Sequence, residues 1–334
     1  MSKVRVAFVG SGGMAQAHAT ALGNVPDAHI VGFCDVNRQL AEEKASQFGG
    51  EAFDEPVKML DAVRPDAVYV LLPPFAHGVE LELVTRGIPF FIEKPIGIDL
   101  HLTRQIARAV RRKKLLTCAG YMNRYRKSVQ TVREMLQSDP AIMVHGGWIG
   151  GTPNPDKGPP IVRWWIDKAK SGGQFLEQVT HTVDIVRFLC GEPVQVHAFA
   201  AKGFNRNVHP DYSIEDASVV NIKFASGAIA NLWASCSTNV GGGVSLNVYA
   251  KSTAAFFTGW DHSVTIQQVG KEPVKIAGEQ NIFDLEDAAF IRAVQNRDPS
   301  AVRSDYLDAA RTLAISIAAN RSMETGRPVK VPRI

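Results

Sequence analysis

The sequence contains little cysteine and no long apolar run. Its four cysteines are far apart and form no C-x-x-C pair, which argues against a disulfide framework and against a structural zinc site. No apolar run approaches the ~18 residues that are needed to cross a bilayer, so no membrane-spanning segment is expected. These absences are typical of a protein of the reducing cytoplasm.

The chain also lacks a strong charge of one sign and the short motifs of several enzyme classes. Its net charge of +4 is spread along 334 residues, which is too weak to indicate nucleic-acid binding. It has no G-x-S-x-G, H-E-x-x-H or Walker A sequence. The histidines show no metal-ligand spacing, so no catalytic metal is expected. What remains is an ordinary globular composition, long enough for two domains.

Strands and helices alternate over the first 120 residues. Apolar strands are predicted at 4–9, 29–34, 67–72, 89–92 and 115–119. Helices are predicted between them at 14–22, at 40–48, before Gly87 and from Asp99, which can cap the helix, to about Lys113. This spacing is typical of a parallel, doubly wound sheet. We therefore assign residues 1–120 to a Rossmann domain.

The pattern changes after residue 120. A strand is predicted at 142–149, a loop rich in glycine and proline at 150–160, and a helix from 163 to 189. Six β runs follow at 194–201, 217–224, 228–236, 244–250, 254–258 and 262–268, and helices at 284–297 and 303–325 close the chain. Short turns such as Ser226-Gly227 indicate an open, mostly antiparallel sheet. Residues 121–334 are expected to form a second α/β domain, with the last helices able to pack back on the first.

A glycine-rich turn follows the first strand. Gly10, Gly12, Gly13 and Met14 belong to a match to G-x-G-x-x-A. Gly10 permits the tight turn, Gly12 lets the backbone approach a pyrophosphate, and the following helix points its amide donors at the phosphates. Asp35 stands about 20 residues further on, at the end of the second strand, so the set indicates dinucleotide binding rather than a structural turn.

The charges that follow the second strand bear on the choice of cofactor. Asp35 can accept hydrogen bonds from a ribose 2′-hydroxyl and would repel a 2′-phosphate, which favours NAD over NADP. Arg38 is equally suited to pair with such a phosphate and to face solvent from a helix, and so it leaves NADP open.

Two segments at strand ends are expected to open on one crevice. Pro73-Pro74 and His77 follow the strand at 67–72, and Glu93-Lys94-Pro95 follows the strand at 89–92. Ligands of open α/β sheets bind outside the carboxyl ends of the strands. A lysine that emerges there is either a strand-end group reaching for water or a functional ammonium in the crevice.

This ordered set of motifs resembles the Gfo/Idh/MocA oxidoreductase family, which includes glucose–fructose oxidoreductase and inositol dehydrogenase. The resemblance rests on the glycine turn, Pro73-Pro74-x-x-His77 and Glu93-Lys94-Pro95, and covers nearly the whole chain. It implies that these segments line the NAD(P) site and that Lys94 reaches both the nicotinamide ribose and the substrate. It also implies a homodimer or homotetramer, because the family commonly covers its open sheet with that of another subunit.

Two sets of residues recur at helical spacing within 172–189. The polar set is Gln174, Glu177, His181 and Asp184, and the apolar set is Phe175, Val179, Val183 and Val186. Each set shares one helix face, and the apolar face suits the core. Taken alone, the polar face is compatible both with a solvated helix surface and with an acid/base site.

The family resemblance favours the acid/base site, because the family carries G-G-x-x-x-D-x-G-x-H-x-x-D here. The glycine pair, His181 and Asp184 match, whereas Glu177 stands where Asp is usual and Val179 where Gly is usual. A neutral imidazole suits removal of a hydroxyl proton. We expect His181 to be the general base or acid, Lys94 to stabilise the reacting oxygen, and Glu177 to orient one of them.

Five further residues are candidate substrate contacts. Tyr121, Asn123 and Arg124 resemble the family segment that lines the cleft. Arg163 and Trp164 offer a guanidinium and an aromatic plane, which suit the hydroxyls and C–H faces of a sugar. A tryptophan beside Arg163 is also an ordinary core residue, and we expect this of at least one of the pair at 164–165.

The expected function is NAD(P)-dependent interconversion of a secondary alcohol and a ketone on a sugar, sugar derivative or cyclitol. One alternative is an NAD-dependent glycoside hydrolase that acts by transient oxidation and elimination. Another is a non-catalytic, dinucleotide-binding regulator, but such a protein would need neither Lys94 nor His181.

Overall fold

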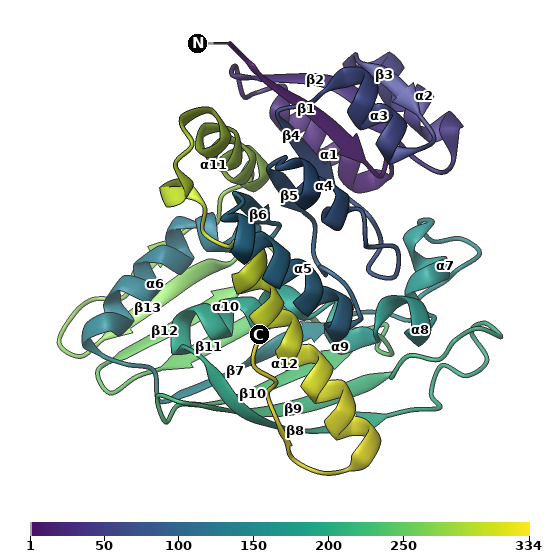
Figure 1. Ribbon diagram of the computed structural model, residues 1–334. Coiled ribbons are helices and arrows are strands. Elements are labelled where there is room, and N and C mark those ends of the chain that lie inside the picture. Colours follow the sequence, from purple (N-terminus) through teal and green to yellow (C-terminus); the bar gives the residue numbers. More distant parts are fainter. Residues whose placement is uncertain (1) are drawn as a thin grey trace. The chain divides into compact units, whose positions relative to one another are not determined.

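The chain forms two compact units in the computed structural model, which describes residues 2–334. Unit 1 comprises the residues up to Met122 together with Asn281–Ala310, and unit 2 comprises Asn123–Gln280 and Arg311–Ile334. Each unit is built on one β-sheet (Figure 1).

Unit 1 contains a six-stranded sheet in the order β3-β2-β1-β4-β5-β6, and every neighbouring pair of strands is parallel. The strands are β1 Val4–Val9, β2 Ala28–Cys34, β3 Glu51–Phe53, β4 Ala67–Val70, β5 Phe90–Ile92 and β6 Thr117–Ala119. The connections run outward in both directions from β1 and β4. The carboxyl ends of these strands therefore form the switch point at which such sheets bind ligands.

Six helices belong to unit 1. They are α1 Gly13–Leu22, α2 Arg38–Phe48, α3 Pro56–Val63, α4 Glu80–Arg86, α5 Leu100–Lys113 and α11 Ile282–Asn296. The aromatic side chains of Phe8, Phe33, Tyr69 and Phe91 fill the core, and Phe290 of α11 joins them. Asp99 caps α5 as predicted, since its carboxylate accepts a hydrogen bond from the His101 amide at 2.7 Å. The parallel fold is confirmed, although β3 and α3 were not predicted.

Unit 2 contains a nine-stranded sheet in the order β14-β13-β12-β11-β7-β10-β9-β8-β15. The strands are β7 Met143–Ile149, β8 Pro193–Ala201, β9 Ala217–Phe224, β10 Ile229–Ser235, β11 Gly243–Tyr249, β12 Thr253–Thr258, β13 Ser263–Gln268, β14 Val274–Ile276 and β15 Val329–Lys330. Only β7 and β10 pair in parallel. The mostly antiparallel sheet and the β9–β10 hairpin at Ser226-Gly227 are thus confirmed.

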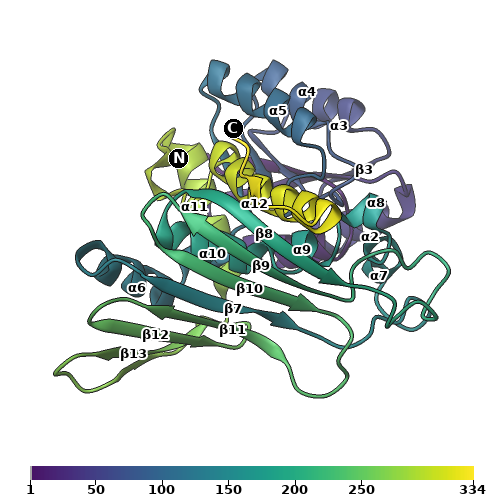
Figure 2. The ribbon, with the colours of Figure 1, turned by 90° about the horizontal axis from the view of Figure 1, so that it is seen from below.

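Helices of unit 2 cover one face of this sheet. They are α6 Lys127–Ser138, α10 Thr180–Cys190 and the part of α12 (Tyr306–Thr325) that lies in this unit. The apolar faces of these helices pack into the core through residues such as Val132 of α6, Val186 of α10 and Ile315 of α12. Figure 2 shows the sheet from the face that these helices do not cover, so that α6 and α10 lie behind the strands. Several large apolar side chains are exposed on the strands, among them Phe199 and Ile229.

The single helix predicted from 163 to 189 is wrong. The segment forms α7 Ile161–Trp165, α8 Lys168–Ser171, α9 Gln174–Glu177 and α10. Gly172 and Gly173 have φ values of +77° and +101°, which a continuing helix cannot accommodate. A Cβ atom on Gly173 would also lie 2.7 Å from the carboxylate of Glu215. That carboxylate accepts the Phe175 amide at 3.0 Å and so holds the start of α9.

Candidate active site

The glycine-rich turn connects β1 to α1 in unit 1. Gly10 has a φ of +97°, and a Cβ atom there would collide with the carbonyl oxygen of Leu71. Only glycine fits this position. Gly12 and Gly13 differ: apart from their chain neighbours and the backbone of their own helix, no atom of the described residues lies within 4 Å of a Cβ built on either of them. This open space in front of α1, whose second residue is the exposed Met14, fits a pyrophosphate at a helix N-terminus.

Asp35 lies directly after β2 and beside the glycine turn. Its Oδ2 accepts a hydrogen bond from the Ser11 amide and its Oδ1 from the Asn37 amide, both at 2.9 Å. Backbone amides therefore fix the carboxylate where a ribose hydroxyl is expected. Arg38 is 59% exposed along its side chain and pairs with Glu42 one turn further along α2 (Nε–Oε1 2.9 Å). The structure favours the solvent-facing interpretation of Arg38.

The segment after β4 turns sharply and places a buried histidine. The Ala76 amide donates to the Pro73 carbonyl at 2.9 Å. Nδ1 of His77 lies 2.5 Å from Oε1 of Glu80, whose Oε2 accepts the Gly78 amide at 2.7 Å. Burial would raise the pKa of Glu80, but His77 and the nearby amides together lower it. Nε2 of His77 is buried and has no hydrogen-bond partner among residues 2–334.

Glu93 and Lys94 directly follow β5. Oε2 of the buried Glu93 carboxylate accepts the Lys94 amide at 2.9 Å, and its Oε1 lies 3.2 Å from Nε2 of His18. Nδ1 of His18 contacts Oδ1 of Asp287 at 2.9 Å. Sequence reasoning gave no role to His18 and did not consider Asp287, and their separation of 269 residues explains why no local pattern revealed the pair.

In unit 2 the predicted polar set is buried. Gln174, Glu177, His181 and Asp184 are 0%, 3%, 8% and 1% exposed. The apolar set lies in the core as predicted. Both faces of α10 are therefore inside the protein, which excludes the solvated-surface alternative. Buried ionisable groups are costly unless they are paired or used, and they concentrate at functional sites.

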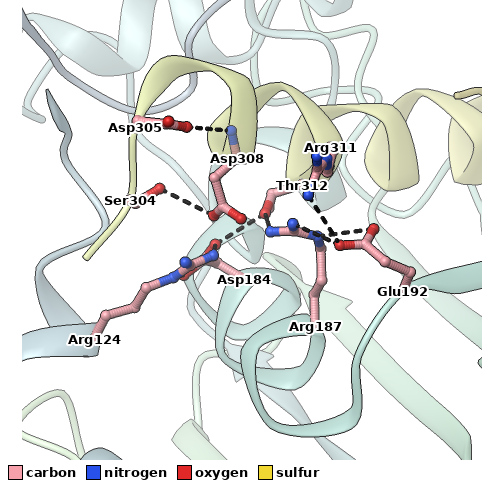
Figure 3. A network of polar contacts seen from close by, with 9 residues as sticks. All are labelled: Arg124, Asp184, Arg187, Glu192, Ser304, Asp305, Asp308, Arg311 and Thr312. Carbon is pink, nitrogen blue, oxygen red and sulfur yellow. Dashed lines mark hydrogen bonds and ion pairs between the residues drawn. The ribbon is translucent and has the colours of Figure 1, made fainter. Parts of the chain in front are cut away.

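Asp184 takes part in a buried network with Arg124 (Figure 3). The Arg124 guanidinium donates to both Asp184 oxygens at 2.7 and 2.6 Å, and the Thr312 hydroxyl donates to Oδ1 at 2.9 Å. Arg187 lies next to them and pairs with Glu192 (Nη2–Oε1 2.8 Å). The bidentate Arg124–Asp184 pair joins α10 to the start of unit 2. It favours a positioning role for Arg124 over the predicted substrate contact.

The other predicted substrate contacts differ in exposure. Tyr121 of unit 1 and Asn123 of unit 2 are buried. Oδ1 of Asn123 accepts a hydrogen bond from Arg126 at 2.7 Å, whereas its Nδ2 has no partner within the described part of the chain. Arg163 is exposed and Trp164 half-buried, while Trp165 fills a small apolar cluster. The expectation that one of the tryptophans packs in the core is confirmed.

Together the sheet order, the glycine turn and the placement of Asp35 define unit 1 as a dinucleotide-binding Rossmann unit. Over residues 2–334 the structure has no helix long and apolar enough to cross a membrane. The same residues contain no group of three or more His, Cys, Asp or Glu side chains that could hold a metal ion.

Comparison with known proteins identifies the family. Residues 4–121 match the oxidoreductase family with an NAD-binding Rossmann fold, and residues 129–254 match the GFO/IDH/MocA C-terminal domain. The chain therefore belongs to the GFO/IDH/MocA family, and it is an NAD-dependent oxidoreductase. The family and the cofactor expected from the sequence are confirmed.

Several characterised proteins are similar over their full lengths. The scyllo-inositol 2-dehydrogenase (NAD(+)) of Bacillus subtilis is 26% identical, with 98% of this chain and 96% of that protein covered. The myo-inositol 2-dehydrogenase of Thermotoga maritima is 23% identical, with 99% of each covered. The structure of a levoglucosan dehydrogenase in complex with NADH superposes with a TM-score of 0.86 at 17% identity, covering 100% of both chains.

Proposed function

We propose that the protein catalyses the reversible, NAD-linked oxidation of a secondary alcohol on a sugar, sugar derivative or cyclitol. The observation that carries this proposal is the buried imidazole of His181, which lies four residues from the buried carboxylate of Glu177. Such a pair suits proton transfer, and it occurs here in a family whose Rossmann unit binds NAD. The names of the similar inositol and levoglucosan dehydrogenases support a polyol as the substrate.

Each group of residues has a proposed task. The turn from Gly10 to Met14 would hold the pyrophosphate and Asp35 the ribose, while Pro73, Pro74, His77 and Glu93 would border the nicotinamide. When bound, NAD would supply the group that takes up the hydride in oxidation and gives it back in reduction. Lys94 would donate a hydrogen bond to the reacting oxygen and stabilise its negative charge. His181 would take the hydroxyl proton in oxidation and return it in reduction, oriented by Glu177.

The substrate hydroxyls would meet side chains at the margin of this site. Trp164 and Arg163 are accessible for stacking and hydrogen bonding. The buried Asn123 amide has donor capacity to spare, and Tyr121 would line the Rossmann side.

A substrate panel tests the proposal. Purified protein is incubated with NAD or NADP and with myo-inositol, scyllo-inositol, levoglucosan and simple hexoses. The absorbance of reduced nicotinamide and the carbohydrate products are followed together. We expect NADH to accumulate with at least one polyol and the ketone to form in equal amount. Sugar release without NADH would instead indicate the glycoside hydrolase, and NAD binding without any turnover would indicate a regulator.

We also propose that the open face of the nine-stranded sheet pairs with a second copy of the chain, in a homodimer or homotetramer. Met143, Phe199, Val219 and Ile229 are exposed strand residues, and an apolar sheet face of this kind needs cover. The molar mass from light scattering tests this, and a monomer at micromolar concentration would contradict it.

The four cysteines are buried thiols, which supports a location in the cytoplasm.

A further inference from the structure

We propose that His18 is a positioning residue for Lys94. Clamped by Asp287, it holds the carboxylate of Glu93, and this carboxylate fixes the backbone from which the Lys94 side chain extends. The inference rests on the proposed role of Lys94, and it assigns a task in catalysis to α11, a helix from the far end of the chain.

The contacts form an unbroken series within unit 1. Asp287 of α11 approaches Nδ1 of His18 with both oxygens, at 2.9 and 3.0 Å, and also accepts the Tyr69 hydroxyl at 3.2 Å. Nε2 of His18 lies 3.2 Å from Oε1 of Glu93. Oε2 of Glu93 accepts the Lys94 amide at 2.9 Å. Both imidazole nitrogens therefore face carboxylates, which favours the doubly protonated cation, since each nitrogen can then donate.

The cluster is buried, and its carboxylates stabilise the charged form of His18. His18 and Asp287 are fully buried, and rings surround the imidazole, with Phe91 and Phe283 centred 4.8 and 5.2 Å away. Burial lowers the pKa of His18, but the charges and hydrogen bonds of Asp287 and Glu93 outweigh burial and raise it to about 10. His18 thus remains a cation at neutral pH.

The surroundings leave the Glu93 carboxylate little freedom. A Cβ atom on Gly120 would lie 2.6 Å from Oε1 of Glu93, so the chain after β6 closes on the carboxylate from another side. Well-packed apolar residues often replace buried ion networks without loss of stability. A network kept at the base of Lys94 is therefore better explained by the placement of that lysine than by stability alone.

A double-mutant cycle tests whether His18 acts through Lys94. The variants are His18→Asn, Lys94→Ala and the double variant, with Tyr69→Phe as the matched control because it removes a contact to Asp287 without touching Glu93. We expect His18→Asn to lower kcat by about 10- to 100-fold, as small misplacements of reacting groups do. In the Lys94→Ala background the same change should lower kcat by less than about twofold. Equal effects in both backgrounds would overturn the inference.

A second readout does not depend on turnover. Lysines are reductively methylated with ¹³C-formaldehyde, and the Lys94 signal is assigned by its absence in Lys94→Ala. We expect His18→Asn to shift or broaden this signal in spectra of the NAD-bound protein, whereas Tyr69→Phe should leave the signal in place. If His18→Asn does not fold, Glu93→Gln replaces it with the same expected result. An unmoved signal would refute positioning by His18. Wild-type turnover of Lys94→Ala would instead refute only the proposed role of Lys94.

Discussion

The two units hold their candidate functional groups in different ways. In unit 1 the groups stand at strand ends, and the backbone fixes them: the φ of Gly10, and the Ser11 and Lys94 amides that bind Asp35 and Glu93. In unit 2 they lie on short helices packed inside the protein, and side-chain contacts such as Arg124–Asp184 hold them. Local backbone geometry thus dominates at the proposed cofactor contacts of unit 1, where His18 and Asp287 add one long-range contact at Glu93. The proposed acid/base groups of unit 2 depend on tertiary packing.

This contrast implies different responses to substitution. A change at a strand end of unit 1 should alter cofactor binding with a local effect on structure. A change on α9 or α10 should alter both turnover and the stability of unit 2, because every residue from Thr180 to Arg187 is buried.

The largest effect is expected at the two residues proposed to act on the reacting hydroxyl. Lys94→Ala and His181→Ala should each lower kcat by roughly 10²–10⁴-fold, since one removes charge stabilisation and the other the proton acceptor. NAD affinity, measured by fluorescence titration, should change far less in His181→Ala than in Lys94→Ala. Turnover close to wild type in either variant would show that the residue is not catalytic.

Breaking the buried pair of unit 2 should cause the next largest change. Arg124→Leu leaves the Asp184 carboxylate buried without its main partner, and we expect the free energy of unfolding to fall by about 3–5 kcal/mol. The control is Glu42→Gln, which breaks the exposed Arg38–Glu42 pair in unit 1 and should leave the free energy of unfolding nearly unchanged. Urea denaturation measures both. Similar small losses would mean that the Arg124–Asp184 pair does not hold α10.

A pair of glycine variants separates backbone geometry from ligand space. Gly10→Ala forces a side chain into a left-handed conformation and against the Leu71 carbonyl, and should cost about 1–3 kcal/mol. Gly12→Ala should leave stability within about 0.5 kcal/mol of wild type. Because it fills the space proposed for the pyrophosphate, it should weaken NAD binding by roughly tenfold, equivalent to about 1.4 kcal/mol. Calorimetry and thermal melts give the two quantities, and unchanged NAD affinity in Gly12→Ala would place the pyrophosphate elsewhere.

The same contrast explains what the sequence alone could predict. The glycine turn, Asp35 and the Asp99 cap are set by residues close together in the chain, and their predicted structures were found. The strand β3 was missed because it has only three residues, none of them buried, so it carries no apolar pattern. The helix α6 was missed although Val129 and Val132 are buried, because no side chain caps its N-terminus and the sequence therefore carries no start signal.

The errors in the candidate site have a common origin. Helical spacing correctly predicted that the apolar set packs in the core. It could not show that Gly172 and Gly173 break the helix or that Arg124 pairs with Asp184, 60 residues away. The cluster of His18, Glu93 and Asp287 was likewise invisible. Partners so far apart in sequence meet only through the packing of α11 with α1.

The last expected effect is a pH dependence of the stability of unit 1, which develops gradually over several pH units. The fold raises the pKa of His18 from 6.5 to about 10, so its stabilising contribution is complete below pH 6.5 and is lost as the pH rises through about 10. Between these values the free energy of unfolding should fall more steeply for the wild type than for His18→Asn. Urea titrations across this window measure the slopes. Parallel slopes would mean that His18 is not a buried cation, and Tyr69→Phe should keep the steeper wild-type slope.

The central claim is that Lys94 of the Rossmann unit and His181 of α10 act on one substrate oxygen. The most direct measurement is a crystal structure of the protein with NADH and a polyol that it oxidises. We expect the Lys94 ammonium and one His181 ring nitrogen to lie at hydrogen-bond distance, about 2.6–3.2 Å, from the same hydroxyl oxygen. A substrate bound with either side chain turned away from that oxygen would contradict it.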